Sequence, residues 1–247
     1  MTLWLVLIGA VFVAWTIDAA IGFGSLVIAL SLAALVLPLE QAMFILVPLN
    51  ILLSGYLSLR YRRFIAVDLL LHRLLPAMLV GMLVGVVLHP WLPSTLLQWL
   101  FALLIIWFAS RSLWLAYQPL AELKPHPVAR TYVLTLGAGV THGLFASGGP
   151  LLVYALTGQH LDKRTFRATL SVVWFSLNSL LTGWFLFTGR LSDSFSTVLW
   201  LVPVVISAMV FGEWLHSRIS EEKFRRAVLI MLLLTGCILM WNNVSRL

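Results

Sequence analysis

The chain has 247 residues, of which 61% are hydrophobic and only 10% charged, and its mean hydropathy is +1.01. Soluble domains are about half apolar and about a quarter charged, so this composition excludes a globule with a polar surface and indicates a membrane protein embedded in the lipid bilayer. The net charge of +7 does not indicate nucleic-acid binding, because the basic residues form short clusters between apolar runs, as cytoplasmic loops of membrane proteins do.

The N-terminal apolar run has no basic region before it and is longer than a signal-peptide core, so we expect a retained membrane segment. The single cysteine, Cys237, excludes an internal disulfide and a multi-cysteine metal site. No metal site, catalytic residue or cofactor is predicted.

In chain order, six apolar stretches are long enough for one spanning helix, which needs roughly 20 residues. They are residues 41–59, 74–89, 95–117, 165–188, 195–216 and 223–241. Two further stretches, residues 3–37 and 132–158, are too long for one span and short for two, and both have glycines in their middle. We expect each of these to be a re-entrant hairpin or a pair of short, tilted spans.

The two halves of the chain match each other at an offset of about 125 to 128 positions, as an internal repeat does. The stretch from Asn50 to Tyr56 corresponds to the stretch from Asn178 to Trp184. Aligned asparagine, serine or threonine, and glycine are harder to obtain by chance than aligned leucines. The match therefore favours a duplication over chance similarity between apolar helices.

Loop charges predict that the two halves have opposite orientations in the membrane, since basic loops stay in the cytoplasm. The loop after the first clean span has four arginines: Arg60, Arg62, Arg63 and Arg73. The equivalent loop of the second half has only Arg190, beside Asp193. The next pair of loops shows the reverse, with basic residues only in the second half: Arg218, Lys223, Arg225 and Arg226.

The predicted fold class is an all-α polytopic membrane protein with two inverted-topology repeats. Each repeat has a glycine-broken re-entrant hairpin, or pair of short spans, plus three full transmembrane helices. One integrated membrane domain contains repeat 1 at residues 1–120, a cytoplasmic linker at 121–130 and repeat 2 at 131–247. Basic residues place both ends of the second broken segment in the cytoplasm, and both termini are then extracytoplasmic.

The break in each hairpin falls at a short glycine-containing sequence. These sequences are Gly22-Phe23-Gly24-Ser25 and Ser147-Gly148-Gly149-Pro150. A helix that begins inside the membrane exposes unsatisfied N–H groups, which attract anions. Pro150 suits the first position of such a helix, and Ser25 suits a cap or a hydroxyl donor. The alternative, that glycines serve close helix packing, is the interpretation we favour for Gly81 and Gly85.

Four polar residues within the predicted membrane segments complete the predicted site, because polar groups inside a membrane are functional candidates. Asp18 and His142 each precede a hairpin tip by about one turn, so either is a candidate to carry a coupled proton. The alternatives are a solvated carboxylate and a histidine bonded to backbone. Asn50 and Asn178 either bind substrate opposite the tips or bond a neighbouring helix.

The pattern resembles the sulfite exporter TauE/SafE family, the toluene sulfonate uptake permease group. The resemblance rests on the two tips, the asparagine-containing spans, the basic turn at residues 59–64 and the proline-glycine helix at residues 74–85. The family's tip is a fuller Gly-x-Gly-Gly-Gly run, so both tips here are reduced. The resemblance implies an inner-membrane carrier of sulfite, an organosulfonate or a related sulfur anion, and leaves its direction open.

The sequence thus predicts a secondary transporter of a small anion that works by alternating access, with proton coupling as one option. A passive anion channel on the same scaffold is the alternative. A membrane-embedded enzyme is disfavoured, because the sequence has no clustered metal ligands, Gly-x-Ser-x-Gly elbow or Walker loop. A homo-oligomer remains an option.

Overall fold

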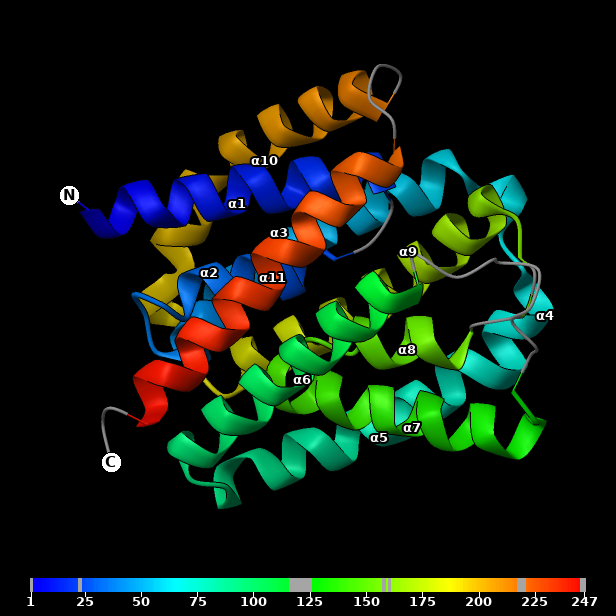
Figure 1. Ribbon diagram of the computed structural model, residues 1–247, viewed down its shortest axis with the longest axis horizontal. Helices are drawn as coiled ribbons and strands as arrows, with labels where there is room; N and C mark the ends of the chain where they lie inside the picture. Colours follow the sequence, from blue (N-terminus) through cyan, green and yellow to red (C-terminus); the bar gives the residue numbers. More distant parts are fainter. Residues whose placement is uncertain are drawn as a thin grey trace. The chain divides into compact units, whose positions relative to one another are not determined.

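A computed structural model describes residues 2–21, 24–115, 126–156, 159, 161–216 and 221–244. Regular secondary structure within these residues is entirely helical (Figure 1). The first half contains α1 (Thr2–Ile21), α2 (Ser25–Ala33), α3 (Leu39–Arg60), α4 (Val67–Leu69), a π-helical stretch (Leu70–Leu74), α5 (Leu75–Leu88) and α6 (Ser94–Leu115). The second half contains α7 (Val128–Phe145), α8 (Gly149–Ala155), α9 (Lys163–Phe187), α10 (Phe195–His216) and α11 (Glu221–Val244). Short 3-10 turns lie at Arg62–Phe64, His89–Trp91 and Ser192–Ser194.

Five helices within the described residues are long and apolar enough to cross a membrane. They are Leu39–Arg60, Val67–Trp91, Ser94–Leu115, Lys163–Phe187 and Ser192–Trp214. The chain is therefore a multi-pass membrane protein, and five of the six predicted clean spans lie in these helices. The sixth lies in α11, where residues Leu229–Val244 form a shorter apolar helix.

Both glycine-broken segments are helical hairpins with unequal arms. In the first, α1 is 20 residues long, about 30 Å at 1.5 Å per residue, and α2 has 9 residues. In the second, α7 has 18 residues and α8 has 7. The two arms of each hairpin contact each other. The same order of long and short helices thus occurs in both halves, while the inversion of the halves relative to the membrane stays a prediction.

The helices form two compact units, each of which takes helices from both halves. Unit 1 contains Met1–Leu75 and Leu161–Ile219, and unit 2 contains Pro76–His160 and Ser220–Leu247. In unit 1, α1 packs along α10 and α3 packs along α9. In unit 2, α6 packs along α11, and α7 packs on α8. The long helix of each hairpin therefore contacts other helices of its own unit.

Glycines allow the closest helix contacts within each unit. A Cβ on Gly212 of α10 would lie 2.5 Å from the Thr16 carbonyl oxygen of α1. In unit 2, a Cβ on Gly81 of α5 would lie 2.1 Å from the Leu136 carbonyl oxygen of α7, and a Cβ on Gly85 would lie 2.4 Å from the Val140 carbonyl oxygen. Such contacts occur widely in membrane proteins, where small residues let helix backbones approach. The prediction that Gly81 and Gly85 serve packing is confirmed.

The C-terminal end of α9 is closed by a Schellman motif. Gly189 adopts a left-handed conformation with φ of +71°, and its N–H donates to the Leu186 carbonyl at 3.1 Å. The Arg190 N–H donates to the Phe185 carbonyl at 3.0 Å. These two bonds satisfy carbonyls that the end of a helix leaves free. They also direct the chain after α9 back toward the start of α3.

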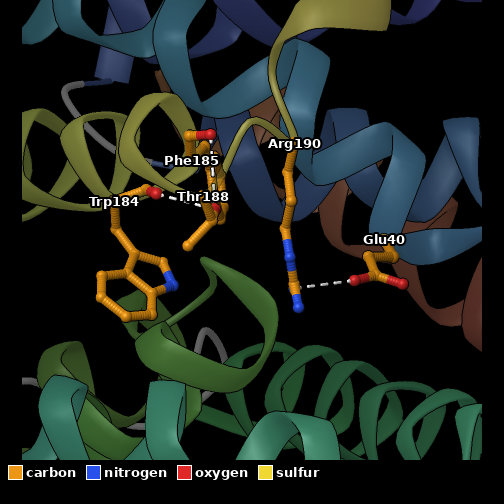
Figure 2. Close-up of polar contacts among 5 residues, drawn as sticks. All are labelled: Glu40, Trp184, Phe185, Thr188 and Arg190. Carbon is orange, nitrogen blue, oxygen red and sulfur yellow. Dashed lines mark hydrogen bonds and ion pairs between the residues drawn. The ribbon is translucent and has the colours of Figure 1, made fainter.

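An ion pair joins the end of α9 to the first turn of α3. Figure 2 shows Arg190 extended toward Glu40, with 3.1 Å between Nη1 and Oε1. Beside it, the Thr188 hydroxyl donates to the Trp184 carbonyl at 2.8 Å, so the last turn of α9 is held by a side chain as well. The N-terminal end of α3 therefore meets the C-terminal end of α9.

Candidate functional site

A continuous chain of hydrogen bonds in unit 1 connects four of the predicted site residues. The Asn178 Nδ2 on α9 donates to the Asn50 Oδ1 on α3 at 2.7 Å. The Asn50 Nδ2 in turn donates to the Ser25 hydroxyl on α2 at 2.7 Å. The Ser25 hydroxyl donates to a carboxylate oxygen of Asp18 on α1. All four side chains are buried, so four helices of unit 1 meet at one polar centre.

This chain of bonds has a direction, since each donor points toward Asp18. The Ser25 backbone N–H also donates to the same Asp18 oxygen, at 3.3 Å. At the other end, the Asn178 Oδ1 is buried and has no hydrogen-bond partner among the described residues. Bonds aligned in one direction polarise each other, so a change of charge at Asp18 affects the asparagine pair. The two repeat-equivalent asparagines thus bond each other rather than two separate partners.

The break between α1 and α2 positions the Ser25 side chain. Gly24 has φ of +108°, a left-handed conformation that glycine adopts without a Cβ penalty. This turn places Ser25 one residue later at the start of α2, facing the last turn of α1. Two roles were predicted for Ser25, as a hydroxyl donor and as a helix cap. The hydroxyl donates, as predicted, but the cap of α2 is Gly24, which has no side chain to bond the helix. The predicted site residues Gly22 and Phe23 lie outside the described residues.

Arg167 is a buried cation near the polar centre of unit 1, and the sequence did not single it out as a site candidate. Its side chain is only 8% exposed, although it lies in the second turn of α9. One guanidinium nitrogen donates to the Ala19 carbonyl of α1, and the group lies over the Tyr61 ring, 4.9 Å from the centroid. The Nε atom is buried with no hydrogen-bond partner in the described part of the chain. A fixed positive charge with a free donor therefore lies beside the residue that follows Asp18.

The sequence does contain a signal for Arg167. It precedes Asn178 by 11 positions, about three helical turns, so both lie on the same face of α9. Together with Lys163 and Arg164, however, it forms a basic cluster, and such clusters mark cytoplasmic loops. Arg164 fits that interpretation, because it is exposed in the structure. Helical spacing alone does not separate Arg167 from its exposed neighbours, because Arg164 precedes Asn178 by 14 positions and lies only about 40° from the same face of α9.

The second hairpin tip, in unit 2, also has a buried polar group. After α7, Ala146 adopts a left-handed conformation with φ of 51°, and its N–H donates to the His142 carbonyl at 2.7 Å. Pro150 lies in the first turn of α8, where its missing N–H is not needed, at the second position of the helix and not at the predicted first. The Ser147 hydroxyl is buried with no hydrogen-bond partner among the described residues.

Close packing surrounds this second tip. A Cβ on Gly148 would lie 2.4 Å from the Ala138 carbonyl oxygen and 3.0 Å from the His142 Cβ. His142 itself is fully buried in α7. Gly148 is therefore required sterically, and Gly149 opens α8 next to it. The structure groups Asp18, Ser25, Asn50 and Asn178 in unit 1, and His142, Ser147, Gly148, Gly149 and Pro150 in unit 2.

Similarity to known proteins covers most of the chain. The sequence model of the sulfite exporter TauE/SafE family matches residues 7–239. The chain is 28% identical over 189 residues, which is 75% of each chain, to the probable inner membrane transporter protein TsaS of Comamonas testosteroni. No solved structure matches the chain.

Proposed function

Because the chain belongs to the sulfite exporter TauE/SafE family, we propose that it is a secondary transporter of sulfite, an organosulfonate or a related sulfur oxyanion. Family membership makes it a membrane transporter and not an enzyme. Together with the long apolar helices, it places the chain in the inner membrane as a multi-pass protein. The choice of substrate and the mechanism are the parts that we propose.

The observation that carries the proposal is the buried polar centre of unit 1. Asp18, Ser25, Asn50 and Asn178 are buried among apolar helices, where polar groups are costly and are typical of transport paths. Arg167 adds a positive charge and a free N–H donor next to it. A sulfur oxyanion has several acceptor oxygens and no need of a metal or cofactor, so N–H and O–H donors with one guanidinium suit it.

Asp18 provides a physical route to proton coupling. An ionised carboxylate repels an approaching oxyanion, whereas a protonated carboxyl does not and can donate a hydrogen bond. Binding of a proton to Asp18 would therefore favour binding of the anion, and both would move together. In the hydrogen-bond chain Asp18 is the final acceptor, so its protonation also reorients the Ser25 hydroxyl and the asparagine pair behind it.

In unit 2, the second tip has a buried donor of its own, the Ser147 hydroxyl. It is buried without a partner in the described residues, so it is a donor available to a bound oxyanion. Gly148 lets this tip pack against α7, since a Cβ there would meet the Ala138 carbonyl oxygen, and Gly149 begins α8 with Pro150 in its first turn. His142 is a second candidate for the coupled proton.

Thermal stabilisation of the purified protein in detergent tests the substrate class. The panel is sulfite, thiosulfate, an arylsulfonate, sulfate and acetate, each at the same ionic strength. A ligand that binds the folded state raises Tm by mass action. We expect at least one sulfur oxyanion to raise Tm in the wild type and not in Arg167→Gln. Stabilisation by acetate alone would contradict the sulfur assignment.

A further inference from the structure

A second group of cationic side chains lies in unit 2 around Tyr154, a residue of α8 that the proposed transport path does not use. The Arg111 guanidinium carbon, near the end of α6, is 3.9 Å from the centroid of the Tyr154 ring. Arg130, in the first turn of α7, donates to the Tyr154 hydroxyl at 2.7 Å. The His126 ring meets the same ring edge to face, 4.9 Å between centroids. The helices α6, α7 and α8 contact one another in this unit (Figure 1).

The charge of this group is not balanced by the described part of the chain. Neither Arg111 nor Arg130 is paired with a carboxylate there, and Arg111 is only half-exposed. The Tyr154 ring attracts both guanidinium groups through its face and its hydroxyl, but it carries no charge of its own. Two like charges held against one neutral ring repel each other, so the arrangement favours an anion between them.

His126 provides an independent sign of a missing ligand. Its Nε2 atom is buried with no hydrogen-bond partner among the described residues. Burial and the nearby charge of Arg130 hold the pKa of His126 below its ordinary value of 6.5, and the Tyr154 backbone acts in the opposite direction. Arg111 lowers this pKa as well. A group with a free nitrogen among cations is suited to an acceptor-rich ligand.

We propose that Arg111, Arg130 and His126 form a second oxyanion site, distinct from the polar centre of unit 1. Its ligand is a tetrahedral or pyramidal oxyanion group, either a free sulfur oxyanion or the phosphate of an anionic lipid headgroup. A planar guanidinium binds two oxygens of such a group at once, and a protonated His126 donates to a third. Trp107, 5.6 Å from Tyr154 between ring centroids, gives the site an aromatic wall of the kind found at membrane interfaces.

The two sources of the oxyanion predict different experiments. On the predicted topology the central linker is cytoplasmic, so the site lies where anionic lipid headgroups and cytoplasmic anions both reach it. Binding of either raises the pKa of His126, because the protonated ring gains an opposite charge. The affinity for the anion therefore rises as the pH falls through that pKa.

The test measures the pKa of His126 by NMR in the full-length protein, labelled at histidine and embedded in phosphatidylcholine nanodiscs. The His126→Gln variant identifies the signal among the six histidines. Sulfate is the probe for a free oxyanion, with chloride at equal ionic strength as its control. Replacement of part of the phosphatidylcholine by phosphatidylglycerol is the probe for a lipid headgroup.

We expect sulfate or phosphatidylglycerol to raise the pKa of His126 by about 0.5 or more, well above the effect of chloride. The rise in pKa should disappear in Arg111→Gln and in Arg130→Gln, of which Arg130 is the more exposed residue. It should persist in the control variant Arg62→Gln, which removes an exposed charge of unit 1. A rise with sulfate identifies a free anion, and a rise with phosphatidylglycerol alone identifies a lipid. An unchanged pKa with both probes, or a rise that survives both variants, would overturn the proposal.

Discussion

Replacement of Arg167 by glutamine removes a buried charge of unit 1 and leaves a shorter, uncharged N–H donor. The guanidinium now donates to the Ala19 carbonyl and retains a buried Nε without a partner in the described residues. If that nitrogen binds the transported oxyanion, the variant loses one charge-assisted hydrogen bond, worth about 1.5 to 3 kcal/mol. At about 1.4 kcal/mol per factor of ten, the affinity for the anion should fall roughly 10- to 100-fold.

The assay is uptake of radiolabelled sulfite by proteoliposomes, with KM and maximal rate measured separately. Arg164→Gln is the matched control, since it removes an exposed charge one turn earlier on the same helix. Arg167→Lys keeps the charge without the planar fork and should recover part of the affinity. A purely structural role at the end of α1 would lower Tm or the amount of folded protein and leave KM unchanged. A KM for Arg167→Gln within twofold of wild type would refute the assignment.

Three further outcomes are expected. Asp18→Asn cannot gain or lose a proton, so sulfite flux through this variant should no longer respond to an imposed pH gradient; a retained response would exclude Asp18 as the coupling group. Gly212→Val places a side chain against the α1 backbone and should lower the free energy of unfolding by about 1 to 3 kcal/mol. Its control is Gly183→Ala, which adds a methyl group in open space and should leave that free energy unchanged or raise it. Urea or thermal unfolding measures both variants. A double-mutant cycle on Glu40→Gln and Arg190→Gln should give a coupling of about 0.2 to 1 kcal/mol that decreases with salt, as half-exposed ion pairs do; zero coupling at low salt would mean that the ion pair does not hold α3 to α9.

The fold class was predictable because the length of an apolar run reports directly on the thickness of the bilayer. Five predicted spans lie in helices that the structure shows to be long and apolar enough to cross a membrane. The hairpins were predictable as breaks, since glycine and proline interrupt helices for local reasons. Their unequal arms were not, because the length of each arm depends on the helices that pack against it.

The polar candidates for the site could be picked out one by one from the sequence, but the bonds between them could not. Asn50 and Asn178 stood out as polar residues at equivalent positions, and both are buried in unit 1. That they bond each other depends on how α3 packs along α9, and no local pattern encodes that register. Arg167 was missed because arginine near a helix end is usually a topology signal, and only packing decides whether it is exposed or buried.

Accumulation of sulfite in sealed proteoliposomes distinguishes coupled transport from a passive channel. Vesicles with equal sulfite inside and outside are given a pH gradient at zero membrane potential, with the acidic side reversed in a second set. Coupling through Asp18 should give net sulfite movement against its own concentration in at least one orientation, and none in vesicles with Asp18→Asn or without protein. Sulfite that only equilibrates under every gradient would show a passive channel and exclude coupled transport.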